Sequence, residues 1–107
     1  MNSLFIDTAS NKEVIIKLTT HDRSFEIKQE ISFNRTQVVL PLIEKLLKDH
    51  NLSLQNIDSV EVNAGPGSFT GVRVGVAIAN AIAFALQIPV NGITLKENGK
   101  LVEPIYS

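Results

Sequence analysis

The alternation of apolar and polar residues along the chain predicts five β-strands. Residues 3–8 and 14–18 form two short apolar runs, which is typical of buried strands, and the polar residues between them indicate a hairpin. Charged side chains alternate with Phe, Ile and Gln over residues 25–30, a period of two that indicates a strand with one solvated face at a sheet edge. Two further runs of β character follow later in the chain, over residues 59–63 and 90–95.

An amphipathic helix with marked ends is expected between the third and fourth strands. Apolar residues form a stripe over residues 38–47, and the charged residues of this segment fall on the other side. Asn34 is expected to cap the start of the helix, with Gln37 as its capping-box partner. At the other end, Asn51 suits the left-handed backbone position that follows a last helical turn.

A long apolar run over residues 70–87 predicts a second helix. Its polar residues Arg73, Asn80 and Gln87 are spaced by seven and therefore fall on one line along the helix. The side opposite this line is expected to pack on the sheet. That side carries Val74, Ile78, Ile82 and Ala85, with Gly71 and Gly75 alongside.

The second helix is apolar nearly all round, which is unusual for a helix on the outside of a single chain. Two interpretations stay open. Either the first helix covers the surplus apolar surface, or that surface binds a second protein whose helix approaches closely over small residues. The second interpretation predicts an interface formed by both helices. Its expected residues are Val39, Arg73, Val76, Ala77, Ala79, Asn80, Ala83 and Phe84.

A glycine-rich segment, residues 64–71, joins the fourth strand to the second helix. Backbone N–H groups at such a helix start attract anions. The segment lacks the Lys of a Walker A loop and does not have the spacing of a nucleophile elbow. We therefore expect it to cap the helix through Ser68 or Thr70 and to seat it on the sheet, while contact with an anion or nucleotide stays open. The residues that would face such a ligand are Gly65, Gly67, Ser68, Thr70 and Gly71.

Composition removes several classes of function. The 107 residues carry a net charge of −1 and no cysteine, which argues against a nucleic-acid-binding domain, disulfides and Cys-based metal or thiolate chemistry. No signal peptide is visible, and polar residues interrupt the apolar run of the second helix. We therefore expect a cytoplasmic protein without a membrane segment.

In chain order the elements have the arrangement βββαβαβ, and no repeat or linker divides them. This order predicts a single α/β domain over residues 1–107, with a mixed five-stranded sheet and two helices, as in a ribonuclease H-like or actin-like half-domain. The Asn98-Gly99 pair predicts a short hairpin within the tail over residues 96–107.

Asp7, at the end of the first strand, is the main candidate for catalytic chemistry. Actin-like phosphotransferases and ribonuclease H-like nucleases carry a metal-binding carboxylate at this place, and a nuclease needs several carboxylates together. Glu61 is the only neighbouring candidate, and the glycine that phosphotransferases usually have after the Asp is missing. A structural role of Asp7 in holding the first turn is therefore expected, with no catalytic residue and no metal site.

The segment Gly-Pro-Gly-Ser-Phe-Thr-Gly-Val-Arg-Val-Gly at residues 65–75 closely resembles the signature of the TsaB (YeaZ) family. The resemblance is long, covering residues 3–95, and is therefore more specific than a short motif. Supporting similarity lies in residues 6–8, 40–43, 52–58, 77–79 and 88–90.

This resemblance implies an actin-like (ASKHA) half-domain and a role in making N6-threonylcarbamoyladenosine (t6A) in tRNA. It implies a non-catalytic scaffold that binds and activates TsaD, the transferase subunit, through its two helices in a helical bundle. A TsaE-like ATPase joins the pair, homodimers form when the protein is alone, and tRNA is met only indirectly. No resident cofactor is implied, and a nucleotide at a partner interface stays open.

Three departures from the family pattern change these expectations. Members are about twice as long, whereas residues 96–99 here replace the start of their second half-domain, and residues 101–106 resemble the segment that closes the full-length protein. A short single-lobe form is therefore expected, in which the tail replaces the second lobe. Residues 35–37 replace a His-Ser-Glu-like helix start. The alternatives are a small actin-like enzyme acting on a phosphate or peptide bond, and a homodimeric scaffold that does not bind TsaD.

Overall fold

Four strands form one mixed sheet in the order β3-β2-β1-β4, in a computed structural model that describes residues 1–31 and 35–92. The strands are β1 (Ser3–Asp7), β2 (Glu13–Thr19), β3 (Ser24–Glu30) and β4 (Ser59–Val62). The helices are α1 (Arg35–Asp49) and α2 (Phe69–Leu86), with a short 3-10 turn η1 (Leu54–Asn56) between α1 and β4. These bounds confirm the first four predicted strands and both predicted helices. The capping role of Asn34 and the tail over residues 96–107 lie outside the described residues.

Pairing within the sheet changes direction at β1. β1 and β2 are antiparallel with Leu4 opposite Leu18, and β2 and β3 are antiparallel as well. β1 and β4 are parallel, with Leu4 opposite Val60. Residues directly opposite one another in neighbouring strands point to the same face of the sheet. Leu4, Leu18 and Val60 therefore share one face, and all three are buried.

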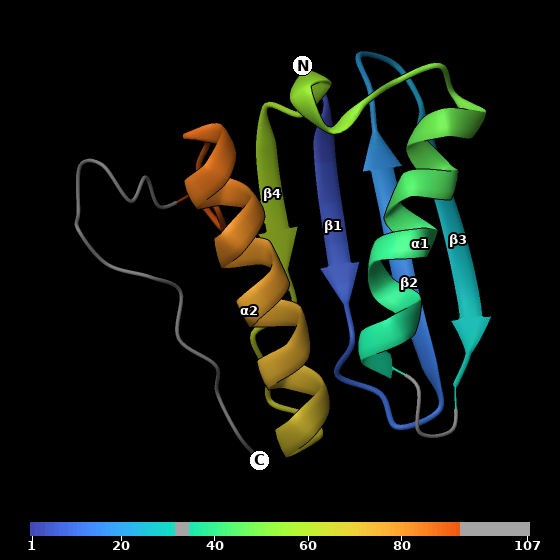
Figure 1. The fold of residues 1–107 in the computed structure, drawn as a ribbon, viewed down its shortest axis with the longest axis vertical. Coiled ribbons are helices and arrows are strands. Elements are labelled where there is room, and N and C mark those ends of the chain that lie inside the picture. The colour runs from blue at the N-terminus through green and yellow to red at the C-terminus, as the bar shows by residue number, and fades with distance from the viewer. Residues whose placement is uncertain (32–34, 93–107) are drawn as a thin grey trace.

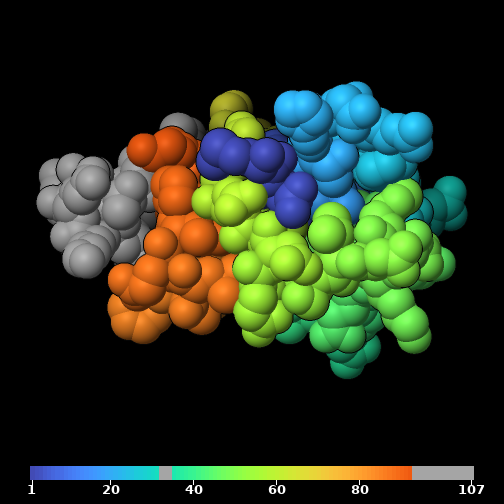
Figure 2. Space-filling view, turned by 90° about the horizontal axis from the view of Figure 1, so that it is seen from above, coloured from blue at the N-terminus to red at the C-terminus, as the bar shows by residue number. Residues whose placement is uncertain are grey.

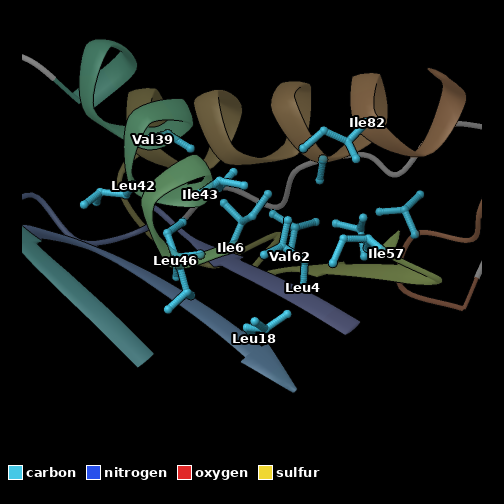
Figure 3. Close-up of a cluster of buried hydrophobic side chains, with 14 of the residues drawn as sticks. Leu4, Ile6, Leu18, Val39, Leu42, Ile43, Leu46, Ile57, Val62 and Ile82 are labelled. Atoms are coloured by element: carbon cyan, nitrogen blue, oxygen red, sulfur yellow. The ribbon is translucent and has the colours of Figure 1, made fainter. Parts of the chain in front are cut away.

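Both helices lie over this same face (Figure 1), with α1 against β2 and β3, and α2 against β4 and β1. The side chains between the two layers form a single apolar core. Figure 3 shows Ile6 of β1 beside Ile43 of α1, with Leu4 and Val62 further along the sheet and Ile82 of α2 above β4. The apolar stripe of α1 therefore packs against the apolar face of the sheet. Burial of these two surfaces against each other is what stabilises a two-layer domain.

The end of α1 follows its sequence signal. Asn51 adopts the left-handed conformation with a φ of 59°, and the Leu52 N–H donates to the Leu47 carbonyl oxygen at 2.9 Å. This bond across the last turn satisfies a carbonyl that the helix itself leaves free. The following connection runs across the end of the sheet, where Asn2 bonds to Asn56 and Asp58, and Figure 2 shows the N-terminal residues lying against it.

The predicted fifth strand is not confirmed in the described part of the chain. Val90 pairs with Val60 in one isolated parallel bridge, and the chain then turns at Asn91 and Gly92, whose φ angles are 49° and 78°. A strand cannot continue through two left-handed residues, so the apolar run that begins at Val90 was misleading as a strand signal there. Residues 93–95 of the prediction lie outside the described residues.

Candidate functional site

The glycine-rich loop leads from β4 directly into α2. Ser68 is the N-cap of α2, because its hydroxyl oxygen accepts a hydrogen bond from the Gly71 N–H at 3.2 Å. The Ser68 N–H donates to the Ala9 carbonyl oxygen at 3.0 Å and so ties the loop to the end of β1. The predicted capping role of Ser68 is confirmed, whereas Thr70 lies inside the first turn of α2 and is exposed.

Glycines of the loop and helix make the contact between α2 and β1 possible. A methyl group at Gly71 or Gly75 would overlap the carbonyl or hydroxyl oxygen of Thr8, and a Cβ at Gly67 would lie 2.7 Å from the Ala9 Cβ. Thr8 is fully buried, and its hydroxyl donates to the Gly71 carbonyl oxygen. The glycines therefore seat α2 on the end of β1 at a distance that larger residues would not permit.

Asp7 holds the turns at the ends of β1 and β4. Its Oδ1 accepts hydrogen bonds from the Ala9 N–H at 3.0 Å and from Asn63 Nδ2 at 3.2 Å. The Oδ1 of Asn63 in turn accepts from the Gly65 N–H at 3.0 Å. The carboxylate thus has the structural contacts that the sequence predicts for it. Within residues 1–31 and 35–92, no three His, Asp or Glu side chains come together as metal ligands would.

Arg35 was not singled out by the sequence for this loop, yet it lies at the same place. Its Nη2 donates to the Ser10 carbonyl oxygen at 2.8 Å, and its guanidinium would lie 3.2 Å from a Cβ at Gly71. Its Nε is buried without a hydrogen-bond partner among the described residues. A cation beside the start of α2 adds to the positive end of that helix, which favours anions. Contact of the loop with an anion or nucleotide stays a prediction.

The inner face of α2 differs from the predicted one. The buried face is centred on Val72, Val76, Ala79 and Ala83, which lies ~130° around the helix from the predicted face at 100° per residue. Of the residues predicted to pack on the sheet, Gly71, Gly75 and Ile82 are buried, Val74 and Ile78 are half-buried, and Ala85 is exposed.

Five predicted interface residues are buried inside the chain, four of them on α2 because of this rotation and one, Val39, on α1. Val39, Val76, Ala79 and Ala83 are buried in the chain's own core, and Asn80 is buried at 8% exposure. The prediction treated Asn80 as an outward polar residue together with Arg73, whereas only Arg73 is exposed. Small residues face inward because α2 approaches the sheet closely at Thr8. An exposed place is therefore observed for Arg73, Ala77 and Phe84 alone among the predicted residues.

The outward face of α2 is nevertheless apolar. Phe84 is 66% exposed and Phe69 is 56% exposed, and Ala77 and Ala81 lie between them on the exposed side. Arg73 is the charged residue of this helix, and its guanidinium lies 5.1 Å from the centre of the Phe69 ring. α1 leaves this face exposed, whereas the small residues on the inner face of α2 do permit close packing within the chain, as one of the two interpretations expected.

Two hollows accompany the exposed apolar side chains. One, of about 420 Å³, lies between the start of α1 at Thr36 and the first half of α2. The second, of about 340 Å³, lies along α1 and the connection after it, next to Leu40, which is 46% exposed. We call the first hollow the α1–α2 groove. Its lining residues are Thr36, Phe69, Thr70, Arg73, Val74, Ala77 and Ile78.

α2 is long and apolar enough to cross a membrane by length and composition alone. Core helices pass the same test, and 44% of this helix is buried within the structure. The apolar residues on the inner face of α2 pack on the sheet. That packing does not account for the apolar residues on its outward face.

A protein-family model described as TsaD, tRNA N6-adenosine threonylcarbamoyltransferase, matches residues 29–96. Curated proteins named tRNA threonylcarbamoyladenosine biosynthesis protein TsaB are similar to the chain. The one from Bacillus subtilis is 35% identical over 115 residues, covering 99% of this chain and 50% of that protein. The one from Haemophilus influenzae is 36% identical over 87 residues, covering 81% and 36%. The chain belongs to the TsaB (YeaZ) family.

Solved structures agree with this membership of the TsaB family. YeaZ from Pseudomonas aeruginosa has a TM-score of 0.80 and 28% sequence identity, covering 92% of this chain and 50% of that one. The fold is thus YeaZ-like. A curated tRNA N6-adenosine threonylcarbamoyltransferase from Nitrosomonas eutropha is also similar, with 42% identity over 69 residues, which are 64% of this chain and 20% of that protein. The matched part of the chain spans between about a quarter and a half of the length of the curated TsaB proteins it matches.

Proposed function

We propose that this chain is a non-catalytic scaffold subunit in tRNA t6A modification, which binds and activates a TsaD-like subunit through α1 and α2. The observation that carries the proposal is the exposed apolar face of α2 within residues 1–31 and 35–92, with Phe84 at 66% exposure. An exposed apolar patch on an otherwise well-packed domain usually marks an association site. The similarity to proteins named for t6A biosynthesis gives the process.

The shape of this face suits a helix from a partner. Ala77 and Ala81 are small and exposed between the two Phe rings, so a partner helix can approach the α2 axis closely there. The α1–α2 groove provides an adjacent hollow for a large side chain of that helix. Aromatic anchors next to a pocket are typical of the residues that contribute most to binding. The same face would serve a homodimer when the TsaD-like subunit is absent.

Other parts of the proposal follow from the same arrangement. Asp7 is engaged in turn-holding hydrogen bonds, which favours a role without chemistry of its own. A TsaE-like ATPase would join the pair, and a nucleotide would reach the glycine-rich loop only at a partner interface. The weak net charge of −1 leaves tRNA contact to the partners. We propose a cytoplasmic location, because the similar curated proteins are named for a step of tRNA modification.

The test is co-purification of this chain with a TsaD-like subunit, followed by titration of the purified pair. Phe84→Asp places a charge in the middle of the apolar face and should weaken binding by tenfold or more, since an aromatic anchor contributes about 2 kcal/mol or more. Val76→Asp would not test the interface, because Val76 is buried at 4% exposure and a charge there would disturb the core.

Gln29→Asp is the matched control, because it adds the same charge to an exposed residue of β3, at the edge of the sheet opposite to β4. It should bind as the unmodified chain does. Equal binding by Phe84→Asp and Gln29→Asp, with unchanged circular dichroism, would exclude the α2 face as the interface. Turnover of nucleotide or peptide by the isolated chain would instead support the enzyme alternative. Self-association without affinity for the TsaD-like subunit would support the homodimeric scaffold.

A further inference from the structure

The outer edge of β4 is the place where the sheet could grow. In a parallel pair, alternate residues of each strand bond to the neighbour, and the residues between them point their backbone groups away. Asn63 bonds inward, since its N–H donates to the Ile6 carbonyl oxygen at 3.0 Å, so Val60 and Val62 point outward. Unpaired N–H and C=O groups at such an edge are a template for a strand from another chain.

The outward N–H and C=O groups of Val60 form hydrogen bonds with the main chain that returns after α2. The Val60 N–H donates to the Pro89 carbonyl oxygen at 3.0 Å, and the Asn91 N–H donates to the Val60 carbonyl oxygen at 2.9 Å. This pair of bonds is the isolated bridge between Val60 and Val90. Beyond it the main chain turns away through the left-handed residues Asn91 and Gly92, so it cannot supply the next pair of bonds.

A side chain supplies that next pair instead. The Val62 N–H donates to Asn91 Oδ1 at 2.7 Å, and Asn91 Nδ2 donates to the Val62 carbonyl oxygen at 3.1 Å. A primary amide offers one acceptor and a donor in the same plane, as a peptide group does. Asn also accepts the left-handed conformation with a φ of 49° that turns the main chain away. Asn91 therefore both bonds to Val62 through its side chain and adopts the left-handed backbone conformation that turns the main chain away.

We propose that the Asn91 amide acts as a substitute strand residue that closes the outer edge of β4 and prevents a second copy of this chain from adding a strand there. Val60 and Val62 carry the outward backbone groups of this four-residue strand, so the four bonds above leave none of these groups open. The proposal does not depend on the proposed binding of a TsaD-like subunit, which uses the helices.

Asn91→Gly tests the amide without straining the backbone, because Gly adopts a φ of 49° freely. Asn51→Gly is the matched control: Asn51 has a φ of 59°, and its side chain makes no hydrogen bond within the part of the chain described. Amide hydrogen exchange of Val62 should become about tenfold faster in Asn91→Gly, as expected for one lost hydrogen bond that restrains local opening. It should stay unchanged in Asn51→Gly.

Association through the edge is measured by sedimentation in a Phe84→Asp background, which removes the proposed helix contact. Asn91→Gly should show a mass that rises with concentration, and Asn51→Gly should remain at the monomer mass. Asn91→Asp is a second variant for the case in which Asn91→Gly does not fold. It keeps the acceptor for Val62 but loses the donor, so it should also associate. Unchanged exchange at Val62 in Asn91→Gly, or faster exchange in that variant without any rise in mass, overturns the proposal. For Asn91→Asp, whose acceptor is kept, a mass that stays at the monomer value overturns it.

Discussion

Replacing Gly75 by Ala should destabilise the protein, although the same change usually stabilises a helix. Gly75 lies in the middle of α2 and faces β1, where an added methyl group would overlap the Thr8 hydroxyl oxygen. Thr8 is fully buried and its hydroxyl donates to the Gly71 carbonyl oxygen, so it has little room to move without losing that bond.

Three contributions decide the size of the effect. Helix propensity favours Ala over Gly by ~1 kcal/mol. Overpacking a well-filled site costs ~1–3 kcal/mol, and displacing the Thr8 hydroxyl from its acceptor costs ~1 kcal/mol more. The net expectation is a loss of ~1–3 kcal/mol in the free energy of unfolding. With a urea m value of ~2 kcal/mol/M, the midpoint should fall by roughly 1 M.

Urea unfolding followed by circular dichroism measures this loss, and two further variants isolate its cause. Ala81→Gly, at an exposed position of the same helix, reports the propensity term alone and should cost ~1 kcal/mol. Thr8→Ala removes the atom that the new methyl group meets. The double variant Thr8→Ala with Gly75→Ala should therefore lose less than the sum of the two single changes. Additivity within ~0.5 kcal/mol, or a gain of stability in Gly75→Ala, would refute the close-contact argument.

Two other changes test the loop around this contact. Ser68→Ala removes the cap acceptor of the Gly71 N–H and should cost ~1 kcal/mol by urea unfolding, whereas Ser68→Gly should cost only a few tenths, so equal losses would contradict the capping role. Asp7→Ala leaves the Ala9 N–H and the Asn63 amide without their shared acceptor and should cost ~1–3 kcal/mol in the same assay. A catalytic Asp7 would instead give a stable variant that has lost a turnover shown by the unmodified chain.

Much of the fold could be predicted because the local signals are consistent with one another. The period-two pattern of β3, the apolar stripe of α1 and the Asn51 stop each match the observed element. The fifth strand is not confirmed in the described residues: the apolar residues after Pro89 fit a strand by composition, but the φ angles of Asn91 and Gly92 turn the chain there. Those angles are set by the bonds of Asn91 to β4, which lies 29 residues earlier in the chain.

The site was predicted less well than the fold. When a helix is apolar on several sides, its composition does not show which side faces the sheet. In α2 the close contacts of Gly71 and Gly75 with Thr8 determine that side. The glycine pair Gly71 and Gly75 was placed correctly towards the sheet, whereas the polar line through Asn80 put the rest of the inner face on the wrong side of these glycines. Arg35 was missed since nothing in its neighbourhood in the sequence connects it with Gly71. These two residues meet only in the folded chain.

The parallel pairing of β1 with β4 also has a consequence for the order of folding. Short turns join β1, β2 and β3, whereas 56 residues separate Asp7 from its partner Asn63. Closing a long loop costs more entropy, and non-local pairing slows folding. We therefore expect the first three strands and α1 to form early and β4 to join late. Ile16→Val in β2 should slow refolding, while Val60→Ala in β4 should mainly speed unfolding. Since α2 follows β4, its exposed apolar face would take shape only in the last step, after most of the core has closed.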